Sequence, residues 1–276
     1  MLSIIICSRN LKISSLLGKN ISETVGCDHE IIVIDNSEKR FSIFSAYNEA
    51  IRRARGNILV FMHDDILYKT KNWGCIVAKV LEDEKIGVVG CVGGHVLGKE
   101  PTSWWDSKIL SGCYEQKDGD RINKVVYERY NATLEPISVA AIDGLWMCFR
   151  NDVFNKIRWD EDSFTGFHFY DMDICMQIHS IGMEVKVIYD VLIEHESMGR
   201  CDEKYFEASY IWFNKWKDFL PIISGVSSIV PEVHWYNEYV KEKGEKNSCL
   251  NSHAYRLGCF LLQPVYWIKK KLKRTK

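Results

Sequence analysis

The chain is best understood from the stretch Gly56-Asn57-Ile58-Leu59-Val60-Phe61-Met62-His63-Asp64-Asp65-Ile66. Its apolar residues are typical of a strand buried on both faces of a sheet, and they stop abruptly at one histidine and two carboxylates. In open α/β sheets, ligands lie at the carboxyl ends of the strands. Oxygen ligands together with an imidazole suit a divalent metal ion that holds a phosphate group. The alternative is that an Asp here caps the start of a helix.

The length, charge and cysteines of the chain limit its class. A chain of 276 residues with 46% hydrophobic residues can form one large domain, or one domain with an appendage. The formal net charge is −1, which argues against a general electrostatic attraction of the protein surface to nucleic acid. The 10 cysteines include no C-x-x-C pair, which disfavours zinc-ribbon and redox sites. Without an apparent secretory leader or a membrane-spanning run of ~20 apolar residues, we expect a soluble, cytoplasmic protein.

Strand and helix patterns alternate through the first hundred residues. Helical spacing runs from 42 to 55, and Gly56 is expected to end that helix. This alternation predicts an α/β fold with a mainly parallel central sheet flanked by helices. The expected strands span 2–7, 30–34, 58–62 and 86–91, and the further expected helices span 12–20 and 73–84.

The second part of the chain is less regular. Residues 92–135 are interpreted as a loop-rich excursion, with a possible hairpin around 125–130. An apolar pattern resumes over 139–150. Further helices are expected at 171–181 and 204–219, and short strands at 185–188 and 191–195.

Polar residues also follow the first two expected strands. The first ends in Cys7-Ser8-Arg9-Asn10 and the second in Asp35-Asn36-Ser37. A carboxylate just beyond a strand can accept hydrogen bonds from a nucleotide base or ribose, although Asp-Asn-Ser is also typical of a simple turn. No G-x-G-x-x-G and no G-x-x-x-x-G-K-[ST] motif follows a strand, which disfavours dinucleotide binding and P-loop chemistry.

Taken in order, these strand ends and His63-Asp64-Asp65 resemble the family 2 glycosyltransferases, which have the GT-A fold of nucleotide-diphospho-sugar transferases. The resemblance covers roughly residues 2–200. In that family the third strand ends in a D-x-D metal motif, written here as an H-x-D variant like that of a subgroup related to streptomycin-biosynthesis proteins. It implies that Asp65 binds a metal ion, with His63 and Asp64 as weaker candidates.

Two downstream segments extend the resemblance. Tyr170-Asp171-Met172-Asp173 is similar to the family's E-D-x-D segment, with Tyr170 in place of Glu, and this implies that Asp171 is the general base. At a helix N-terminus the dipole is expected to keep its pKa low. Glu194-His195-Glu196 resembles the family's late histidine, which implies that His195 joins the metal ligands. The alternative for Asp171 and Asp173 is that they are acids of a first helical turn without a catalytic role. The alternative for His195 is that it is a lone surface histidine.

The loop Asp143-Gly144-Leu145-Trp146 looks like the segment that lies beneath the donor and acceptor sugars, the alternative being a turn followed by core aromatics. The resemblance thus implies sugar or acceptor contacts at Asp143, Trp146 and Asp173, and a metal site with Mn²⁺ or Mg²⁺. The nucleotide is expected to contact Ser8, Asp35, Asn48 and Asp64.

The resemblance implies an inverting, metal-dependent glycosyltransferase that moves a sugar from a nucleotide-diphosphate donor to a hydroxyl group, in polysaccharide or glycan biosynthesis. The glycosyltransferase domain is expected over 1–220, with a nucleotide-binding half over about 1–100 and an acceptor half over about 101–200. The alternatives are a catalytically silent nucleotide- or sugar-binding protein of the same fold and, less favoured, a sugar nucleotidyltransferase.

A C-terminal extension is expected over 221–276. Aromatic and aliphatic residues at 260–268 precede six basic residues within 269–276. Such a segment is typical of an interfacial anchor that holds an enzyme on the inner face of a membrane carrying lipid-linked acceptors. The alternative is a helix packed on the domain with a frayed basic end.

Overall fold

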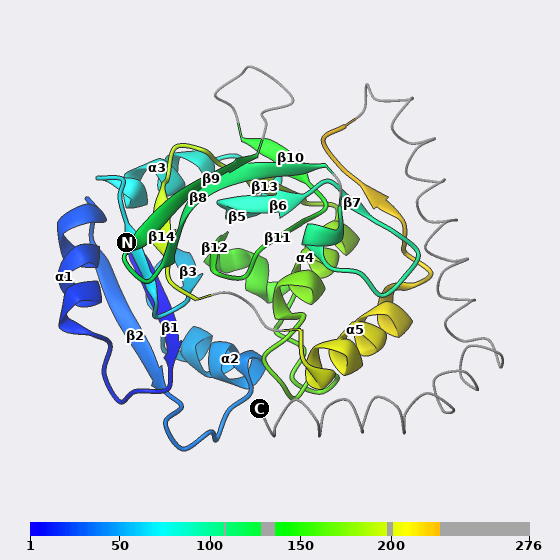
Figure 1. Cartoon of the computed structure of the whole chain (residues 1–276), viewed down its shortest axis with the longest axis horizontal. Helices are drawn as coiled ribbons and strands as arrows, with labels where there is room; N and C mark the ends of the chain where they lie inside the picture. Colours follow the sequence, from blue (N-terminus) through cyan, green and yellow to red (C-terminus); the bar gives the residue numbers. More distant parts are fainter. Residues whose placement is uncertain (108, 128–135, 198–200, 227–276) are drawn as a thin grey trace, which may run out of the picture. The chain divides into compact units, whose positions relative to one another are not determined.

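The computed structural model describes residues 1–107, 109–127, 136–197 and 201–226, within which residues Met1–Val226 form one compact unit. Among these residues, a 7-stranded central sheet has the order β10-β13-β5-β12-β3-β1-β2 (Figure 1). The predicted C-terminal extension begins in the last described residues, and its basic tail lies outside them. The division of the domain into two halves stays a prediction.

The predicted alternation of strands and helices is confirmed in the first hundred residues. β1 and β3 contain no exposed residue, because each is covered on both faces. The described elements here are β1 (Leu2–Ser8), α1 (Ser15–Thr24), β2 (His29–Asp35), α2 (Ile43–Arg53), β3 (Ile58–Met62), β4 (Ile66–Tyr68), α3 (Trp73–Val80) and β5 (Ile86–Gly90).

Gly56 does not end the helix, contrary to expectation, because α2 stops at Arg53 and Ala54 caps it. Gly56 instead lies against β1. A Cβ atom at this position would come within 2.6 Å of the backbone nitrogen of Ser3, so only glycine allows the approach.

The central sheet is mixed, although five of its seven strands run in the same direction, as expected for a mainly parallel sheet. β1 runs parallel to β2 and to β3, and β5 runs parallel to β13 (Glu184–Val187). β12 (Trp146–Arg150) is inserted antiparallel between β3 and β5, and β10 (Ile137–Val139) pairs antiparallel with β13. The chain reaches β12 through a long excursion instead of a crossover helix, so the parallel βαβ rule does not apply to it.

That excursion contains more strand than the sequence predicted. β8 (Leu110–Asp118) and β9 (Arg121–Tyr127) form a hairpin that turns at 119–120, not around 125–130. The outer strand β9 has mostly exposed residues, so it lacks the apolar pattern that predicts a buried strand. The second sheet has the order β11-β6-β8-β14-β4, with β6 (Val92–Gly94), β11 (Ala141–Ile142) and β14 (Ile193–His195).

The remaining described elements are short strands and two helices. β7 (Val96–Leu97) pairs with β15 (Ile222–Ile223), and short 3₁₀ turns span Trp104–Asp106 and Asn151–Asn155. α4 (Tyr170–Ser180) and α5 (Glu203–Trp216) are the two helices predicted in the second part of the chain. Within the described ranges, no helix is long and apolar enough to cross a bilayer.

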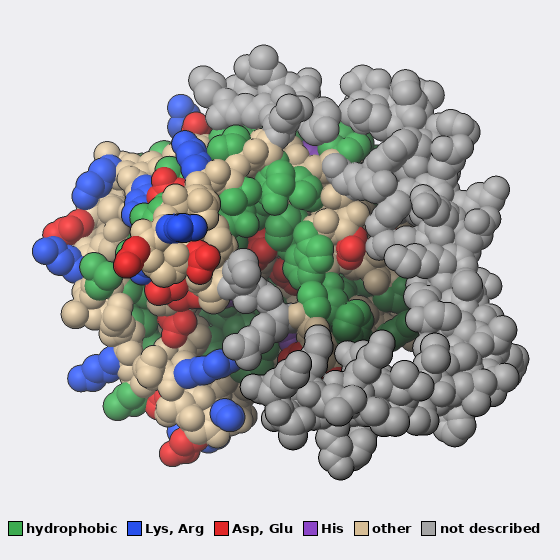
Figure 2. Space-filling model, viewed as in Figure 1, with side chains coloured by type: hydrophobic (Ala, Val, Ile, Leu, Met, Phe, Trp, Pro, Cys, Tyr) green, Lys and Arg blue, Asp and Glu red, His purple; other side chains and the backbone are tan. Residues whose placement is uncertain are grey.

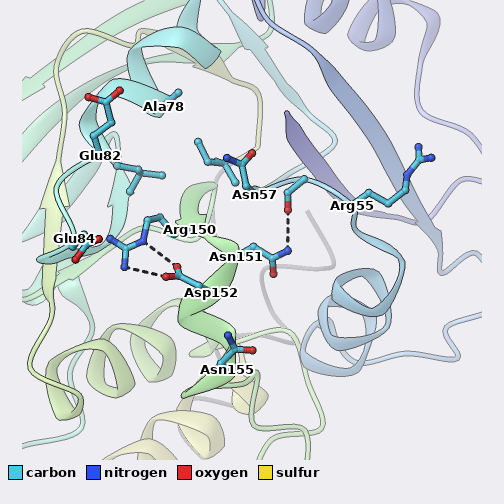
Figure 3. A pocket seen from close by; sticks show the side chains of 12 residues that line it. Arg55, Asn57, Ala78, Glu82, Glu84, Arg150, Asn151, Asp152 and Asn155 are labelled. Carbon is cyan, nitrogen blue, oxygen red and sulfur yellow. Dashed lines mark hydrogen bonds and ion pairs between the residues drawn. The ribbon is translucent and has the colours of Figure 1, made fainter.

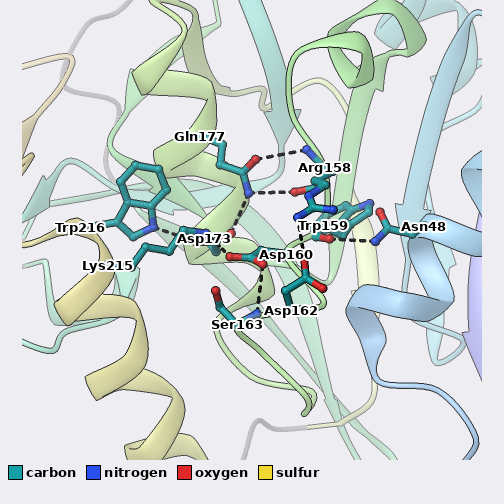
Figure 4. Close-up of polar contacts among 10 residues, drawn as sticks. All are labelled: Asn48, Arg158, Trp159, Asp160, Asp162, Ser163, Asp173, Gln177, Lys215 and Trp216. Atoms are coloured by element: carbon teal, nitrogen blue, oxygen red, sulfur yellow. Dashed lines mark hydrogen bonds and ion pairs between the residues drawn. The ribbon is translucent and has the colours of Figure 1, made fainter.

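A buried charge network joins α4 to α5 (Figure 4). Lys215 Nζ lies 2.7 Å from Asp173 Oδ1 and 2.6 Å from Asp160 Oδ2. Trp216 Nε1 donates to the same Asp173 oxygen over 2.7 Å, and Gln177 Nε2 donates to the other over 2.7 Å. Asp173 is only 1% exposed, so its carboxylate depends on these partners.

We expect Lys215→Met to lower the free energy of unfolding by about 3 kcal/mol, because it leaves the buried Asp173 carboxylate without its cation. Urea denaturation at pH 7 measures this loss. The matched control is Arg158→Met, which breaks the exposed pair with Asp162 and should change the stability by less than about 0.5 kcal/mol. Equal losses in the two variants would contradict the structural role of the network.

Candidate active site

Polar residues that follow three strands meet at one edge of the central sheet. β1, β2 and β3 end at Ser8, Asp35 and Met62, and because they are parallel, these ends share an edge. Ser8 lies opposite Asp35 in the strand register. The hydroxyl of Ser8 donates a hydrogen bond to Asp64 Oδ2 over 2.6 Å. The edge therefore carries three of the four predicted nucleotide-binding residues.

Asp35 offers an ionised carboxylate at this edge. The side chain is partly exposed, and its Oδ1 accepts a hydrogen bond from the backbone N–H of Ser37. That hydrogen bond lowers the pKa of Asp35 below its ordinary value. Asp35 thus combines the turn geometry that its sequence suggested with a partly exposed carboxylate that can accept hydrogen bonds from a ligand.

Asn48, the fourth predicted nucleotide contact, has a different environment. Its amide nitrogen donates to the carbonyl of Trp159 over 2.8 Å and to Glu161 Oε1 over 2.9 Å. Figure 4 shows this side chain pointing from α2 toward the loop that contains Trp159. In this structure Asn48 therefore holds a loop against α2.

His63, Asp65 and His195 form a cluster whose ligand atoms lie within 4.8 Å of one another. His195 Nε2 lies 3.6 Å from Asp65 Oδ1 and 3.4 Å from His63 Nδ1. His63 Nδ1 is 3.9 Å from the same Asp65 oxygen. Two imidazole nitrogens and one carboxylate oxygen therefore converge as they do around a transition-metal ion.

Strand pairing explains how residues so distant in sequence meet. β14 runs antiparallel to β4, with His195 opposite Ile66 and Ile193 opposite Tyr68. Because Ile66 directly follows Asp65, this register places His195 beside the end of the H-x-D motif. The proximity of the late histidine thus follows from backbone hydrogen bonding.

The environment of Asp65 fits a bound cation. Its Oδ2 accepts the backbone N–H of Ser197 over 3.1 Å, whereas its Oδ1 is buried without a hydrogen-bond partner among the described residues. Such an orphaned carboxylate oxygen is costly unless an ion or other partner completes it. Its position facing both imidazoles is where a shared metal ion would satisfy it.

Electrostatics keeps these groups in their metal-binding forms. Burial acts to raise the pKa of Asp65, but the hydrogen bonds from Ser197 and the nearby imidazoles outweigh it, so the pKa is lowered. Burial, with the like charge of His63, lowers the pKa of His195 despite the opposing effect of Asp65. At neutral pH the cluster thus presents a carboxylate and a neutral imidazole, the forms that coordinate metal.

Asp171 is a buried acid in the first turn of α4. It is 9% exposed, its Oδ2 accepts the N–H of Gly144 over 3.2 Å, and its Oδ1 accepts the N–H of Met172 over 2.8 Å. Burial, reinforced by the charge of Asp143, raises its pKa to about 7. The expectation that the helix dipole keeps this pKa low was therefore wrong, because desolvation exceeds the effect of the dipole.

Asp143 links the acid to the metal cluster. Its Oδ1 accepts the N–H of Leu145 over 2.8 Å, which makes it the first residue of the tight turn between β11 and β12. Its negative charge acts on the pKa values of both Asp171 and His195. The predicted sugar loop, the predicted base and the metal cluster therefore belong to one site.

Trp146 and Asp173 lie in the protein interior instead of at this surface. Trp146 is 0% exposed, and its Nε1 donates to the hydroxyl of Tyr68 over 3.0 Å, so it offers no free ring face for stacking on a sugar. The alternative of a turn followed by core aromatics describes it correctly. Asp173 belongs to the network with Lys215, where both of its carboxylate oxygens are occupied.

Two further residues touch the cluster without having been predicted to. The hydroxyl of Tyr170 lies 2.8 Å from His63 Nε2, and the hydroxyl of Ser197 lies 3.3 Å from His195 Nε2. The sequence did contain a signal for Tyr170. This residue stands where the resembled family has Glu, and His63 likewise departs from the D-x-D motif. Ser197 had no such signal.

A separate pocket lies at the opposite edge of the sheet, where β3 begins and β12 ends (Figure 3). Of its charged residues, Arg150 Nε pairs with Asp152 Oδ1 over 3.0 Å, and Arg55 pairs with Glu30, which does not line the pocket. Asn151 donates to the carbonyl of Gly56 over 2.8 Å. The pocket is remote from the carboxyl ends of β1–β3, where a ligand of this fold class binds.

Comparison with known proteins agrees with this geometry. The sequence model of a glycosyltransferase-like family matches residues 3–216, most of the chain. The streptomycin biosynthesis protein StrF of Streptomyces griseus is 27% identical over 164 residues, covering 57% of this chain and 54% of StrF. The chain thus spans about half the length of this curated relative.

The fold is shared with a solved structure. GalNAc-T7, in a crystal structure with UDP, GalNAc and Mn²⁺, superimposes with a TM-score of 0.55 at 12% identity, covering 79% of this chain and 49% of that one. The mannosyltransferase PcManGT of Pyrobaculum calidifontis, with GDP-Man and Mn²⁺, has a TM-score of 0.48 at 13% identity, covering 93% and 82%. The strand ends, the clustered site and the family match together show that this chain belongs to the glycosyltransferase-like family and has the GT-A fold.

Proposed function

We propose that this protein is an inverting, metal-dependent glycosyltransferase that moves a sugar from a nucleoside-diphosphate donor to a hydroxyl group of an acceptor. The observation that carries the proposal is the pairing of a metal-type cluster with one buried acid of raised pKa at the same edge of the sheet. A base whose pKa lies near neutral pH is suited to proton abstraction under physiological conditions.

In the proposed reaction, Asp171 removes the proton of the acceptor hydroxyl while that oxygen attacks the anomeric carbon. The bond between this carbon and the diphosphate oxygen breaks, and the diphosphate leaves with the bonding electrons. A single displacement of this kind inverts the anomeric configuration. Asp143 raises the basicity of Asp171 and contributes to the sugar side of the site.

The metal ion would be held by Asp65 and His195, with His63 as the third ligand. When bound, it neutralises the charge that grows on the leaving diphosphate. Two nitrogen ligands favour Mn²⁺ over Mg²⁺, because Mg²⁺ prefers oxygen ligands. The Mn²⁺ in the related GalNAc-T7 structure supports this choice.

The donor nucleotide is proposed to lie along the ends of β1 and β2. Asp35 would accept a hydrogen bond from the base or ribose, while Ser8 fixes Asp64 beside the diphosphate. The UDP in the GalNAc-T7 structure supports a nucleoside diphosphate as the class of ligand. The acceptor is proposed to be a glycan or a lipid-linked saccharide, and the role to be polysaccharide or glycan biosynthesis.

Nucleic acid is not part of the proposal. On the face shown in Figure 2, basic and acidic side chains are interspersed, and the described residues of that face form no continuous basic surface.

A catalytically silent binding protein would have the same fold. The buried Asp171 argues against that alternative, because an acid whose pKa is raised to about 7 at the same edge as a metal-type cluster is typical of a catalytic site.

We expect Asp171→Asn to lower the rate of donor turnover by ~10²–10⁴-fold, since a positioned general base contributes about that much. The measurement is Mn²⁺-dependent release of nucleoside diphosphate from a panel of nucleotide sugars. In the wild type this rate should fall as the pH drops below about 7, where Asp171 takes up a proton. Asp152→Asn, at the opposite edge of the sheet, is the matched control and should keep full activity.

The stability of the same variant shows whether it is folded. The folded-state pKa of Asp171 is above its unfolded value, so the wild type loses stability as the pH rises from about 4 to about 7. Asp171→Asn removes this penalty, so the metal-free variant should melt no lower than the wild type at pH 8. An active variant, within a few-fold of the wild type, rejects Asp171 as the base.

Nucleoside diphosphates should raise the melting temperature by a few degrees in the presence of Mn²⁺, because saturation at about 100 times Kd adds ~2.7 kcal/mol. EDTA should abolish the shift, and so should Asp65→Ala or His195→Ala, whereas Asp152→Ala should retain it. A shift that persists in EDTA and in Asp65→Ala would overturn the metal-dependent donor site.

We also propose that the protein is cytoplasmic and contacts the inner face of a membrane through its basic tail, which lies outside the described residues. The supporting feature is the aromatic and basic composition of residues 260–276. Deletion of these residues should abolish sedimentation with anionic liposomes, while neutral liposomes should bind neither form. Unchanged sedimentation of the truncated chain would reject the anchor.

A further inference from the structure

The imidazole of His63 has a contact at each of its two ring nitrogens. Nδ1 faces the metal cluster, 3.4 Å from His195 Nε2 and 3.9 Å from Asp65 Oδ1. Nε2 lies 2.8 Å from the hydroxyl of Tyr170, on the other side of the ring. The ring is therefore held between the cluster and one phenol.

The phenol of Tyr170 is itself tightly constrained. It is 7% exposed and lies in the first turn of α4. Its ring packs edge-on against Phe44 and Tyr47, with centroids 6.4 and 6.0 Å away. A hydroxyl on so constrained a ring can fix the orientation of its partner at little further entropic cost.

Gly144 provides the room for this contact. A Cβ atom at position 144 would lie 2.3 Å from the hydroxyl oxygen of Tyr170, so no other residue fits there without moving the phenol. Gly144 also donates its N–H to the base, Asp171. In the turn between β11 and β12, Gly144 thus both leaves room for the phenol of Tyr170 and orients the base.

We propose that Tyr170 is a positioning residue that makes His63 a competent metal ligand. To coordinate through Nδ1, a neutral imidazole must carry its proton on Nε2, and the phenol oxygen of Tyr170 is the acceptor for that N–H. The proposal rests on the metal site of the proposed function. An imidazole at the first position of the H-x-D motif, unlike a carboxylate, needs a partner that fixes its tautomer, and the Tyr170 hydroxyl is in contact with it.

The test is the dissociation constant of Mn²⁺, measured by electron paramagnetic resonance of free Mn²⁺ on the full chain without nucleotide. Tyr170→Phe removes only the hydroxyl and should weaken Mn²⁺ binding about 10–100-fold. In a His63→Ala background, the same substitution should change the constant less than about 3-fold, because no imidazole remains to be oriented.

Tyr47→Phe is the matched control. It removes a hydroxyl from the neighbouring buried ring, for which the described residues show no contact with His63, and it should leave the constant unchanged. An unchanged constant in Tyr170→Phe, or an equal loss in both backgrounds, would overturn the positioning role while leaving the metal site intact. A wild type that binds no Mn²⁺ would overturn the metal site and this inference with it.

Discussion

The antiparallel pairing of β14 with β4 is the constraint on which the candidate site depends. It brings His195 from late in the chain to the residue that follows Asp65. Successive side chains of a strand point to opposite faces, so a slip by one residue would turn His195 away from the cluster and place a glutamate opposite Ile66 instead. The same hydrogen bonds that complete the second sheet therefore set the distance between the imidazole and the carboxylate.

The pKa values of two carboxylates in the site are shifted in opposite directions. Burial acts to raise the pKa of Asp65, but the hydrogen bonds from Ser197 and the two imidazoles lower it, which suits a metal ligand. Asp171 has no cation beside it among the described residues, and the neighbouring charge of Asp143 adds to its burial, so its pKa rises to about 7. Environments that separate the pKa values of nearby acids separate their chemical roles.

The fold was largely predictable where apolar runs are continuous. β1, β2 and β3 follow from apolar runs that end at Ser8, Asp35 and Met62, with polar residues at or directly after these ends. The antiparallel insertion of β12 was not predictable, because its apolar run fits either direction beside β3. The strand β9 is mostly exposed, and its apolar residues do not alternate with polar ones as they do in a half-buried strand.

Single side chains were harder to predict than strand ends. The sequence does not show that Trp146 points into the core, or that Asn48 binds the backbone of Trp159. Burial and pKa depend on packing between elements that are distant in sequence, which explains the wrong expectation for the pKa of Asp171. The contact of Tyr170 with His63 likewise exists only once α4 is packed against the end of β3.

The most direct test of this account is the anomalous diffraction of crystals grown with Mn²⁺ and a nucleoside diphosphate. The account predicts one manganese peak bonded to His63 Nδ1, Asp65 Oδ1 and His195 Nε2, at roughly 2.0–2.3 Å from each. A manganese peak that contacts none of these three atoms, or no peak despite bound nucleotide, would contradict it.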